Sequence, residues 1–480
     1  MLNQKQQLQR LQLQRPLIQM VLPLRQFRRP RLPQKKKPQR KKQRMPPVSA
    51  GAVLLGQQAP RVPFVDLIED RIVEVETHAS IKISEPVVLK KEQTMSKERV
   101  STTVPLNWKE VWYTNCPMVS ANNVDQELGW CREEFKKIGV EYDYFRHAPE
   151  NNWYPHYIHN LDNLIRFGGL YPPIAVNADV RRTVLLGATW VTEGGCMAVR
   201  ARDPIFKMED LKGKKIGLTK SLNTIKNDWW RIQEHMGIEN MLMLNGMTMD
   251  DVEIVEFPYP DDWYDDPKML TPINNPSETW LKRDHKHDLA FRPLETALLD
   301  GTVDAIYTQS KVFQHLQEDT GKIKMIEDLT RYPDWTRQVA NTPAVITCTD
   351  VMAKEHPELV VAYMKAMIKV GRWANEHKHA AAVILNRQTF YRDAEDTYEG
   401  IKHVDMVPSL SAKNLECIKI GKDFMLSHDY IKNDFDVDEW AAPQFLEQAV
   451  RELLEEEWER RSWSKLAEGG GIETESVRLG

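Results

Sequence analysis

Three side chains capable of chemistry lie between positions 116 and 166 of the sequence. Cys116 directly follows the strand-like run "WYTN", and His156 and Arg166 lie downstream, with Gly168 and Gly169 close behind the arginine. A thiol beside an imidazole can transfer a proton or attack as a nucleophile. A guanidinium beside glycine amides, which approach a ligand closely, can hold a two-oxygen anion through parallel hydrogen bonds. Together these residues predict a site that joins a reactive thiol to an anion clamp.

Each of these residues has a plainer explanation when it is taken alone. A free cysteine is among the most buried residue types, and a single histidine is more often structural than functional. The joint occurrence of Cys116, His156 and Arg166 favours a functional site, with His159 as a second candidate for the histidine. His285 and His287 in "RDHKHD" could suggest a metal, but paired histidines in a polar loop are ordinarily solvated, so we predict no metal site.

The elements that must position these residues alternate between short β-type runs and helical stretches from about residue 105 onward, which predicts an α/β fold. Strands are expected in "EVWYTN", "TVLLGATWV", "CMAVRA", "KKIGLT" and "DGTVDAIY", and helices in "NDWWRIQEHMG" and over residues 350–378 and 443–466. The first strand places Cys116 at its carboxyl end. The hydroxyl-rich loop at Thr219 to Ser221, between a strand and a helix, is a second candidate anion site, because backbone amides at such a point face a ligand.

The order of "DLKGKKIG" and "DGTVDAIY" between helices is typical of two-lobed periplasmic-binding-protein-like (type II) folds. In these folds mainly parallel sheets flank a cleft, and the ligand binds at the carboxyl ends of the strands. We predict a first part of lobe 1 at 105–200, lobe 2 at 201–344 and a return to lobe 1 with C-terminal helices at 345–466. Residues 1–94 are expected to form a basic, disordered extension, and residues 467–480 a flexible tail.

The net charge of −4 hides a strong asymmetry along the 480 residues. Residues 1–50 hold 14 of the 65 Lys and Arg residues and no acidic residue, so the rest of the chain has 51 basic against 69 acidic residues, a formal −18. An acidic body argues against nucleic-acid binding by the folded part. We also expect no membrane partner, since no apolar run is long enough to span a bilayer.

Five widely spaced cysteines form neither a disulfide framework nor a CxxC metal pattern. Free thiols suit a reducing compartment, so we expect a cytoplasmic, monomeric protein. The basic N-terminus lacks the apolar run of a secretory signal, and organelle or nuclear targeting by it stays open.

The motifs around the three reactive residues resemble those of the 2'-hydroxybiphenyl-2-sulfinate desulfinases. The cysteine motif Tyr-Ser-Asn-Cys-Pro of that family is similar to "YTNCP" here, and the family's histidine lies ten residues before its Arg-Phe-Gly-Gly motif, as His156 does before "RFGG". The resemblance continues through "GGLYPPI", "LLGATWVTEGG" and "GRWANEH" to "DEWAAPQFLEQAV", over roughly residues 105–450. It favours His156 over His159.

The resemblance implies a cofactor-independent hydrolase of carbon–sulfur bonds that releases sulfite from an aryl sulfinate. It implies that Cys116 is the proton donor or nucleophile, that His156 tunes it, and that Arg166 holds the sulfinate. Thr114, Gly168 and Gly169 are then expected at the substrate, with Thr114 in the place of the family's serine. Residues 258–288 depart from the family pattern, so the substrate can differ where the reaction class does not.

Other readings of the sequence compete with an aryl sulfinate enzyme. The same fold could capture a sulfonate-like or sulfinate-like anion without turning it over, although capture alone does not require the Cys, His and Arg set. A thiamine-pyrimidine-synthase type of enzyme is disfavoured because its cysteine-rich iron motif is missing. A role led by the basic N-terminus, on nucleic acid or an organelle surface, is disfavoured by the acidic body.

Overall fold

The computed structural model describes residues 99–100, 104–147, 153–191, 194–261, 293–338, 342–389 and 391–467. The expected N-terminal extension, the histidine pair at 285 and 287 and the expected C-terminal tail from residue 468 lie outside the described residues.

A first five-stranded sheet carries the strand that ends at Cys116. Its order is β2-β1-β3-β10-β4. Strand β1 pairs in parallel with β2 and β3, whereas β10 runs antiparallel to β3 and β4. The strands are β1 (Glu110–Asn115), β2 (Glu141–Tyr144), β3 (Leu164–Gly168), β4 (Thr183–Thr189) and β10 (Ala344–Thr349).

A second five-stranded sheet forms the other lobe, in the order β7-β6-β8-β5-β9. Here β6 is parallel to β7 and β8, and β5 is antiparallel to β8 and β9. Only one strand in each sheet therefore opposes the other four, which confirms the predicted two-lobed α/β fold with mainly parallel sheets. The strands are β5 (Cys196–Arg200), β6 (Lys215–Ser221), β7 (Glu253–Tyr259), β8 (Ala305–Thr308) and β9 (Ile323–Asp328).

The chain passes between the two sheets earlier than the boundary expected at residue 200. Strand β5 belongs to the second sheet, so the first crossing lies between Thr189 and Cys196. The return crossing lies between Asp328 and Ala344, close to the expected boundary at 344. The sequence of β5 is a continuous apolar run that suits either sheet, so its own residues do not indicate the lobe.

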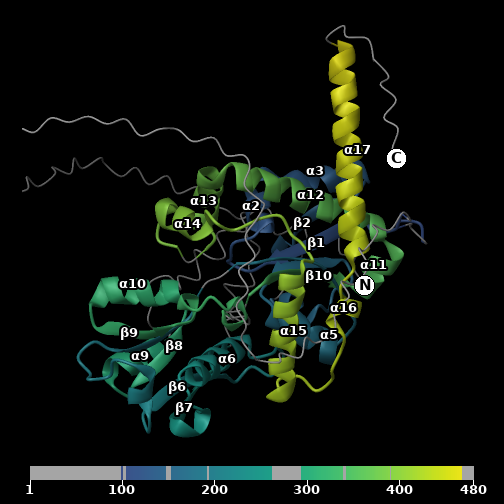
Figure 1. The fold of residues 1–480 in the computed structure, drawn as a ribbon. Coiled ribbons are helices and arrows are strands. Elements are labelled where there is room, and N and C mark those ends of the chain that lie inside the picture. The colour runs from purple at the N-terminus through teal and green to yellow at the C-terminus, as the bar shows by residue number, and fades with distance from the viewer. Residues whose placement is uncertain are drawn as a thin grey trace, which may run out of the picture. The chain divides into compact units, whose positions relative to one another are not determined.

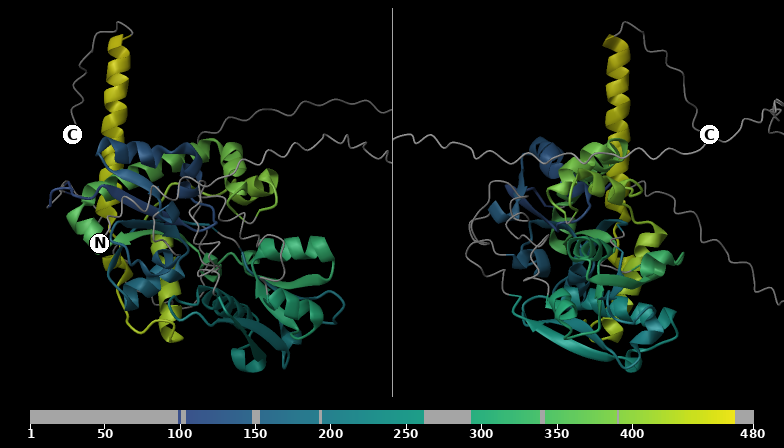
Figure 2. Two further views of the ribbon diagram at one scale, coloured as in Figure 1. Left: turned by 180° about the vertical axis from the view of Figure 1, so that it is seen from behind. Right: turned by 90° about the vertical axis from the view of Figure 1, so that its left-hand side faces the viewer.

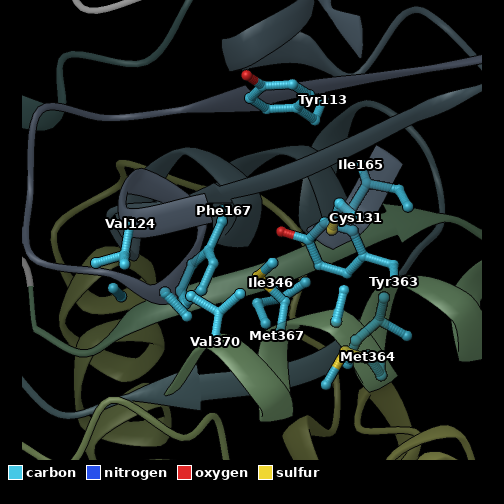
Figure 3. Close-up of a cluster of buried hydrophobic side chains, with 14 of the residues drawn as sticks. Tyr113, Val124, Cys131, Ile165, Phe167, Ile346, Tyr363, Met364, Met367 and Val370 are labelled. Atoms are coloured by element: carbon cyan, nitrogen blue, oxygen red, sulfur yellow. The ribbon is translucent and has the colours of Figure 1, made fainter. Parts of the chain in front are cut away.

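Helices cover both faces of the first sheet (Figure 1). On one face a large apolar core joins the sheet to α2, α3 and α12, and on the other a smaller core joins it to α5, α15 and α16. Figure 3 shows the β-strand residues Ile165, Phe167 and Ile346 directed at the side chains of α12. These helices are α2 (Ala121–Leu128), α3 (Trp130–Lys137), α5 (Tyr171–Asp179), α12 (Pro357–Glu376), α15 (Ala412–Ser427) and α16 (Val437–Trp440).

The second sheet lies between α6 (Trp229–Leu244) on one face and α9 (Pro293–Asp300) with α10 (Ser310–Thr320) on the other. Helix α6 is shared, because Ile238 and Met241 pack in the core of the second lobe while Ile232 and Met236 pack with the smaller core of the first. One helix therefore contributes to the interior of both lobes.

The two predicted C-terminal helical regions are present, and the first is interrupted. The tract expected over 350–378 forms α11 (Asp350–Glu355) and α12, which begins at Pro357 because proline suits the first turn of a helix but not its interior. The last helix, α17 (Pro443–Ala467), extends beyond the helices around it, as Figure 2 shows. The remaining helices are α4 (Tyr154–Ile158), α13 (Lys378–Asn386) and α14 (Ala394–Ile401). No helix among the described residues is both long and apolar enough to span a bilayer.

Candidate active site

Strands β1 and β3 bring the candidate residues together at their carboxyl ends. Thr114 is paired with Arg166 across the two parallel strands, so both side chains lie on the same face of the sheet. One step further along, the backbone N–H of Cys116 donates to the carbonyl of Phe167 at 3.3 Å. Because side chains alternate along a strand, Cys116 and Gly168 continue the face that Thr114 and Arg166 begin.

The Cys116 thiol, the His156 imidazole and the Thr114 hydroxyl form a continuous chain of contacts. The Sγ atom of Cys116 lies 3.2 Å from Nε2 of His156, and Nδ1 of His156 lies 2.9 Å from Oγ1 of Thr114. The imidazole comes from the short helix α4 and is buried, with Tyr157 edge-on to its ring at 4.8 Å between centroids. A thiol that shares a proton with a fixed imidazole is the arrangement used to activate cysteine in covalent and acid–base catalysis.

Arg166 is fully buried and holds its guanidinium against the thiol. Its Nε donates to the His156 carbonyl at 2.8 Å and its Nη1 to the Gly169 carbonyl at 3.0 Å. The remaining nitrogen, Nη2, lies 4.0 Å from Sγ of Cys116 and 3.5 Å from Nε2 of His156. Burial lowers the pKa of Arg166, which the nearby Cys116 opposes.

No carboxylate among the described residues forms an ion pair with Arg166. A buried cation without an anionic partner is costly, so such a group commonly marks a place where an anion binds or forms. The two anions that fit here are a thiolate at Cys116 and a two-oxygen ligand beside Nη2.

Gly168 has no side chain, and the thiol of Cys116 and the guanidinium of Arg166 occupy the space that one would fill. A Cβ atom at this position would lie 2.7 Å from Sγ of Cys116 and 3.0 Å from Nη2 of Arg166. Any side chain here would therefore separate the two groups. The carbonyl of Gly169 accepts a hydrogen bond from Arg166. This contact differs from the expected one, in which the backbone amide of Gly169 donates to a ligand.

The structure separates the two histidines that the sequence offers. His159 is also fully buried, but its Nε2 lies 3.3 Å from Oγ1 of Thr347 on β10. Burial and the positive charges of Arg166 and Arg181 lower the pKa of His159 to about 3, so it is neutral at ordinary pH. Only His156 contacts the thiol among these two, in agreement with the spacing of the motif.

The side chain of Asn123 holds the backbone of Cys116 and is itself held by Gln388, and neither residue was predicted from the sequence. Nδ2 of Asn123 donates to the Cys116 carbonyl at 3.0 Å and to Oε1 of Gln388 at 3.1 Å. Gln388 in turn donates to the Asn123 carbonyl at 2.9 Å. The only local signal is Ser120, the N-cap of α2, whose hydroxyl donates to Oδ1 of Asn123. Gln388 is 265 positions away, and nothing in its own neighbourhood marks it.

The other four cysteines are buried, whereas Cys116 is only partly buried. Burial raises the pKa of Cys131 well above its usual value and that of Cys417 to about 12, so both are held as thiols. Cys131 lies in the apolar cluster drawn in Figure 3. Cys116 is the accessible thiol of the five, as a reactive residue must be.

The hydroxyl loop at Thr219 to Ser221 is not open to an anion. The backbone N–H and hydroxyl of Thr219 both donate to Glu234, and the Ser221 N–H and hydroxyl donate to Asp228 and Asp261. Carboxylates 7 to 40 residues further along the chain already occupy the donors that the strand-to-helix turn provides.

A cavity of about 210 Å³ opens next to the segment that follows Cys116. Both lobes contribute to its wall, since Pro117 to Val119 come from the first sheet's side and residues after β8 and β9 from the second. Cys116, His156 and Arg166 are not among its described lining residues, so it adjoins the reactive groups without containing them. The wall comprises Pro117, Met118, Val119, Gly194, Gln309, Ser310, Lys311, Asp328, Thr330, Thr389, Tyr391 and Gly400.

Comparison with known proteins extends the likeness seen in the motifs. The chain is 26% identical over 370 residues to 2'-hydroxybiphenyl-2-sulfinate desulfinases of Rhodococcus erythropolis and Rhodococcus qingshengii, a match that covers 70% of this chain and 93% of each relative. No family model matches.

Solved structures give the same fold. The crystal structure of a cysteine-to-serine mutant of DszB in complex with biphenyl-2-sulfinic acid superposes with a TM-score of 0.52 at 23% identity, covering 72% of this chain and 99% of that chain. The periplasmic sulfonate-binding protein SsuA of Methylobacillus flagellatus KT gives a TM-score of 0.50 at 20% identity over 72% of this chain and 95% of its own. The chain thus has the fold of DszB and the sulfonate-binding proteins, and it is similar in sequence to the 2'-hydroxybiphenyl-2-sulfinate desulfinases along nearly their whole length.

Proposed function

We propose that the protein is a desulfinase that cleaves the carbon–sulfur bond of an aryl sulfinate and releases sulfite without a cofactor. The observation that carries this proposal is the contact chain from Thr114 through His156 to Cys116, with the buried Arg166 beside the thiol. Relatives named as desulfinases cover most of the chain, and the structure of DszB with biphenyl-2-sulfinic acid concerns the same fold.

The reaction needs one water molecule for balance. Its hydrogen replaces the sulfinate on the ring carbon, and its oxygen turns the departing SO₂ into bisulfite. The two oxygens of the substrate match the donors of a guanidinium, and Nη2 of Arg166 is the part of that group not committed to a carbonyl in the described structure. Arg166 is therefore proposed to hold the sulfinate while the charge develops on the leaving SO₂.

Two roles of Cys116 satisfy this balance. As proton donor, the thiol protonates the ring carbon as the C–S bond breaks, and the thiolate then regains a proton from water, with His156 as the relay. As nucleophile, the thiolate attacks sulfur, the aryl group leaves with the C–S electron pair and takes a proton, and water hydrolyses the Cys116–SO₂ adduct. The Sγ to Nε2 distance of 3.2 Å suits both roles. An acid-quenched mass spectrum in which the Cys116 peptide carries SO₂ during turnover selects the nucleophile, and its absence at burst-phase times selects the proton donor.

Sulfite release from purified protein tests the proposal. We expect 2'-hydroxybiphenyl-2-sulfinate or a related aryl sulfinate to yield sulfite without added cofactor, and Cys116→Ser to lower kcat by about 1,000-fold or more, because a hydroxyl is a far weaker acid than a thiol. Cys417→Ser is the matched control, since its buried thiol donates to the Thr342 carbonyl at 3.0 Å and serine keeps that donor. Circular dichroism checks that both variants fold.

Two outcomes would count against this function. Full activity in Cys116→Ser removes the catalytic role of the thiol. Tight binding of aryl sulfinates or sulfonates with no sulfite release from any of them supports the alternative, a solute-binding protein with the same fold.

A further inference from the structure

A group of histidine and glutamate side chains lies away from the strand ends that carry Cys116. His235 and Glu239 are one turn apart on α6, and His428 directly follows α15. One ligand atom from each of the three lies within 4.8 Å of the others. Nε2 of His428 is 2.9 Å and Nε2 of His235 is 3.9 Å from the same oxygen, Oε2 of Glu239.

The other ring nitrogens are held by hydrogen bonds that fix which nitrogen faces Glu239. Nδ1 of His428 lies 3.0 Å from the Phe424 carbonyl and 3.0 Å from the Ser427 hydroxyl. Nδ1 of His235 lies 3.0 Å from the hydroxyl of Tyr430. In both rings Nε2 is the nitrogen that faces Glu239, so an ion that displaces the protons there would meet two imidazole nitrogens and one carboxylate oxygen, while the other nitrogen of each ring keeps its own partner.

Aromatic packing also holds the two imidazoles in place. Phe424 stacks on His428 at 4.2 Å and lies edge-on to His235 at 5.3 Å between ring centroids, so both imidazoles have fixed planes.

We propose that His235, Glu239 and His428 form a Zn²⁺ site that links the two lobes. Two imidazoles and one carboxylate are ligands that Zn²⁺ takes, and three protein ligands leave a fourth position for water. The side chains are 16%, 41% and 26% exposed, so an ion from solvent can reach them. Since α6 covers the second sheet and α15 packs on the first, a bound ion ties the lobes together.

Zinc affinity measured in a Cys116→Ala background tests the site, because that change removes the accessible thiol as a competing ligand. Competition with a chromophoric chelator should give one zinc per chain. Loss of a ligand in Glu239→Gln or His428→Ala should weaken binding by about 100-fold or more, and Tyr430→Phe by about tenfold, since partners of the ligands typically contribute 10- to 100-fold. Co²⁺ should give the visible absorption of a tetrahedral site in the background chain and not in Glu239→Gln.

Two control variants separate this site from other histidines. His403→Ala removes an exposed histidine outside the group, and His285→Ala with His287→Ala removes the loop pair; both should bind zinc as the background chain does. If Glu239→Gln still binds zinc and the variant without His285 and His287 does not, the ion binds at His285 and His287 instead. If the background chain binds no zinc and the contact between His428 and Glu239 responds only to pH, the two residues form a simple ion pair and the proposed site is overturned. Glu239→Gln is a mild, partly exposed change, so these results do not depend on a variant that fails to fold.

Discussion

Strands β1 and β3 bury different kinds of side chain on their two faces near their carboxyl ends. On one face Tyr113, Ile165 and Phe167 join a continuous apolar core with α12, as Figure 3 shows. On the other face of the same strands Thr114 and Arg166 are buried just as deeply. Burial on the first face stabilises the fold through the removal of apolar surface from water, and burial on the second carries an electrostatic cost.

The core face therefore holds residues that stabilise the fold, and the polar face holds residues that are proposed to act in catalysis. Apolar side chains of similar volume could replace one another on the core face at modest cost. On the polar face the positions depend on individual atoms, since the thiol, imidazole and guanidinium meet through single contacts of 2.9 to 4.0 Å. Substitutions on the core face should therefore change stability, and those on the polar face should change activity.

Among the variants that test the difference between the two faces, the largest effect is expected for Arg166→Met. Loss of the guanidinium should lower kcat/KM for sulfite release by about 100- to 1,000-fold, the range typical of removing one preorganised donor from a developing charge. The melting temperature should stay equal or rise, because an apolar chain of similar length replaces a buried charge that has no described carboxylate partner. Arg181→Met, which removes a contact to Asp162 at 2.6 Å, is the control and should keep its activity. A large loss of stability in Arg166→Met with normal activity per folded molecule would reverse the assignment of the two faces.

An intermediate effect of the opposite kind is expected for Ile165→Ala. This side chain is fully buried on the core face, and its truncation should lower the free energy of unfolding by about 2–5 kcal/mol. Urea unfolding measures the change, and kcat per folded molecule should remain within about threefold of the parent chain, a difference no larger than the net contribution of one hydrogen bond. A loss of kcat as large as that of Arg166→Met would show that the faces are not separable.

The smallest effect is expected for His159→Gln and depends on pH. The pKa of His159 is lowered from its ordinary value of 6.5 to about 3, so the folded state binds fewer protons than the unfolded state between these values. Its contribution to stability is present above pH 6.5 and is lost as pH falls toward 3. His159→Gln should therefore flatten the decline of unfolding free energy in that window and leave kcat at pH 7 nearly unchanged. An unchanged slope, or a kcat loss equal to that of His156→Gln, would contradict the structural role given to this histidine.

Much of the candidate site could be predicted because its signals are local. The run that forms β1 indicates where Cys116 leaves the sheet, and the resemblance to the desulfinase motif, with its ten-residue spacing, favoured His156 over His159. In the structure His156 lies 3.2 Å from the thiol, and His159 lies against Thr347. Strand register is enough to place Thr114 beside Arg166 once both strands are recognised.

The features that could not be predicted depend on residues far apart in the sequence. Asn123 meets Gln388 only because α2 and the end of α13 lie together in the fold. The loop at Thr219 was expected to receive an anion, and Glu234 takes up its donors from the facing helix. The His235, Glu239 and His428 group was missed for the same reason, since its third member comes from another lobe.

Helix α6 has a consequence for how the molecule holds together as a whole. Ile232 and Met236 complete the interior of one lobe, and Ile238 and Met241 complete that of the other. Unfolding of either lobe removes α6 side chains from the apolar core of the other lobe. The thermal stabilities of the lobes are therefore coupled, and the protein should melt in a single cooperative step. The helix that lies between the lobes is in this sense the element that makes two sheets one folding unit.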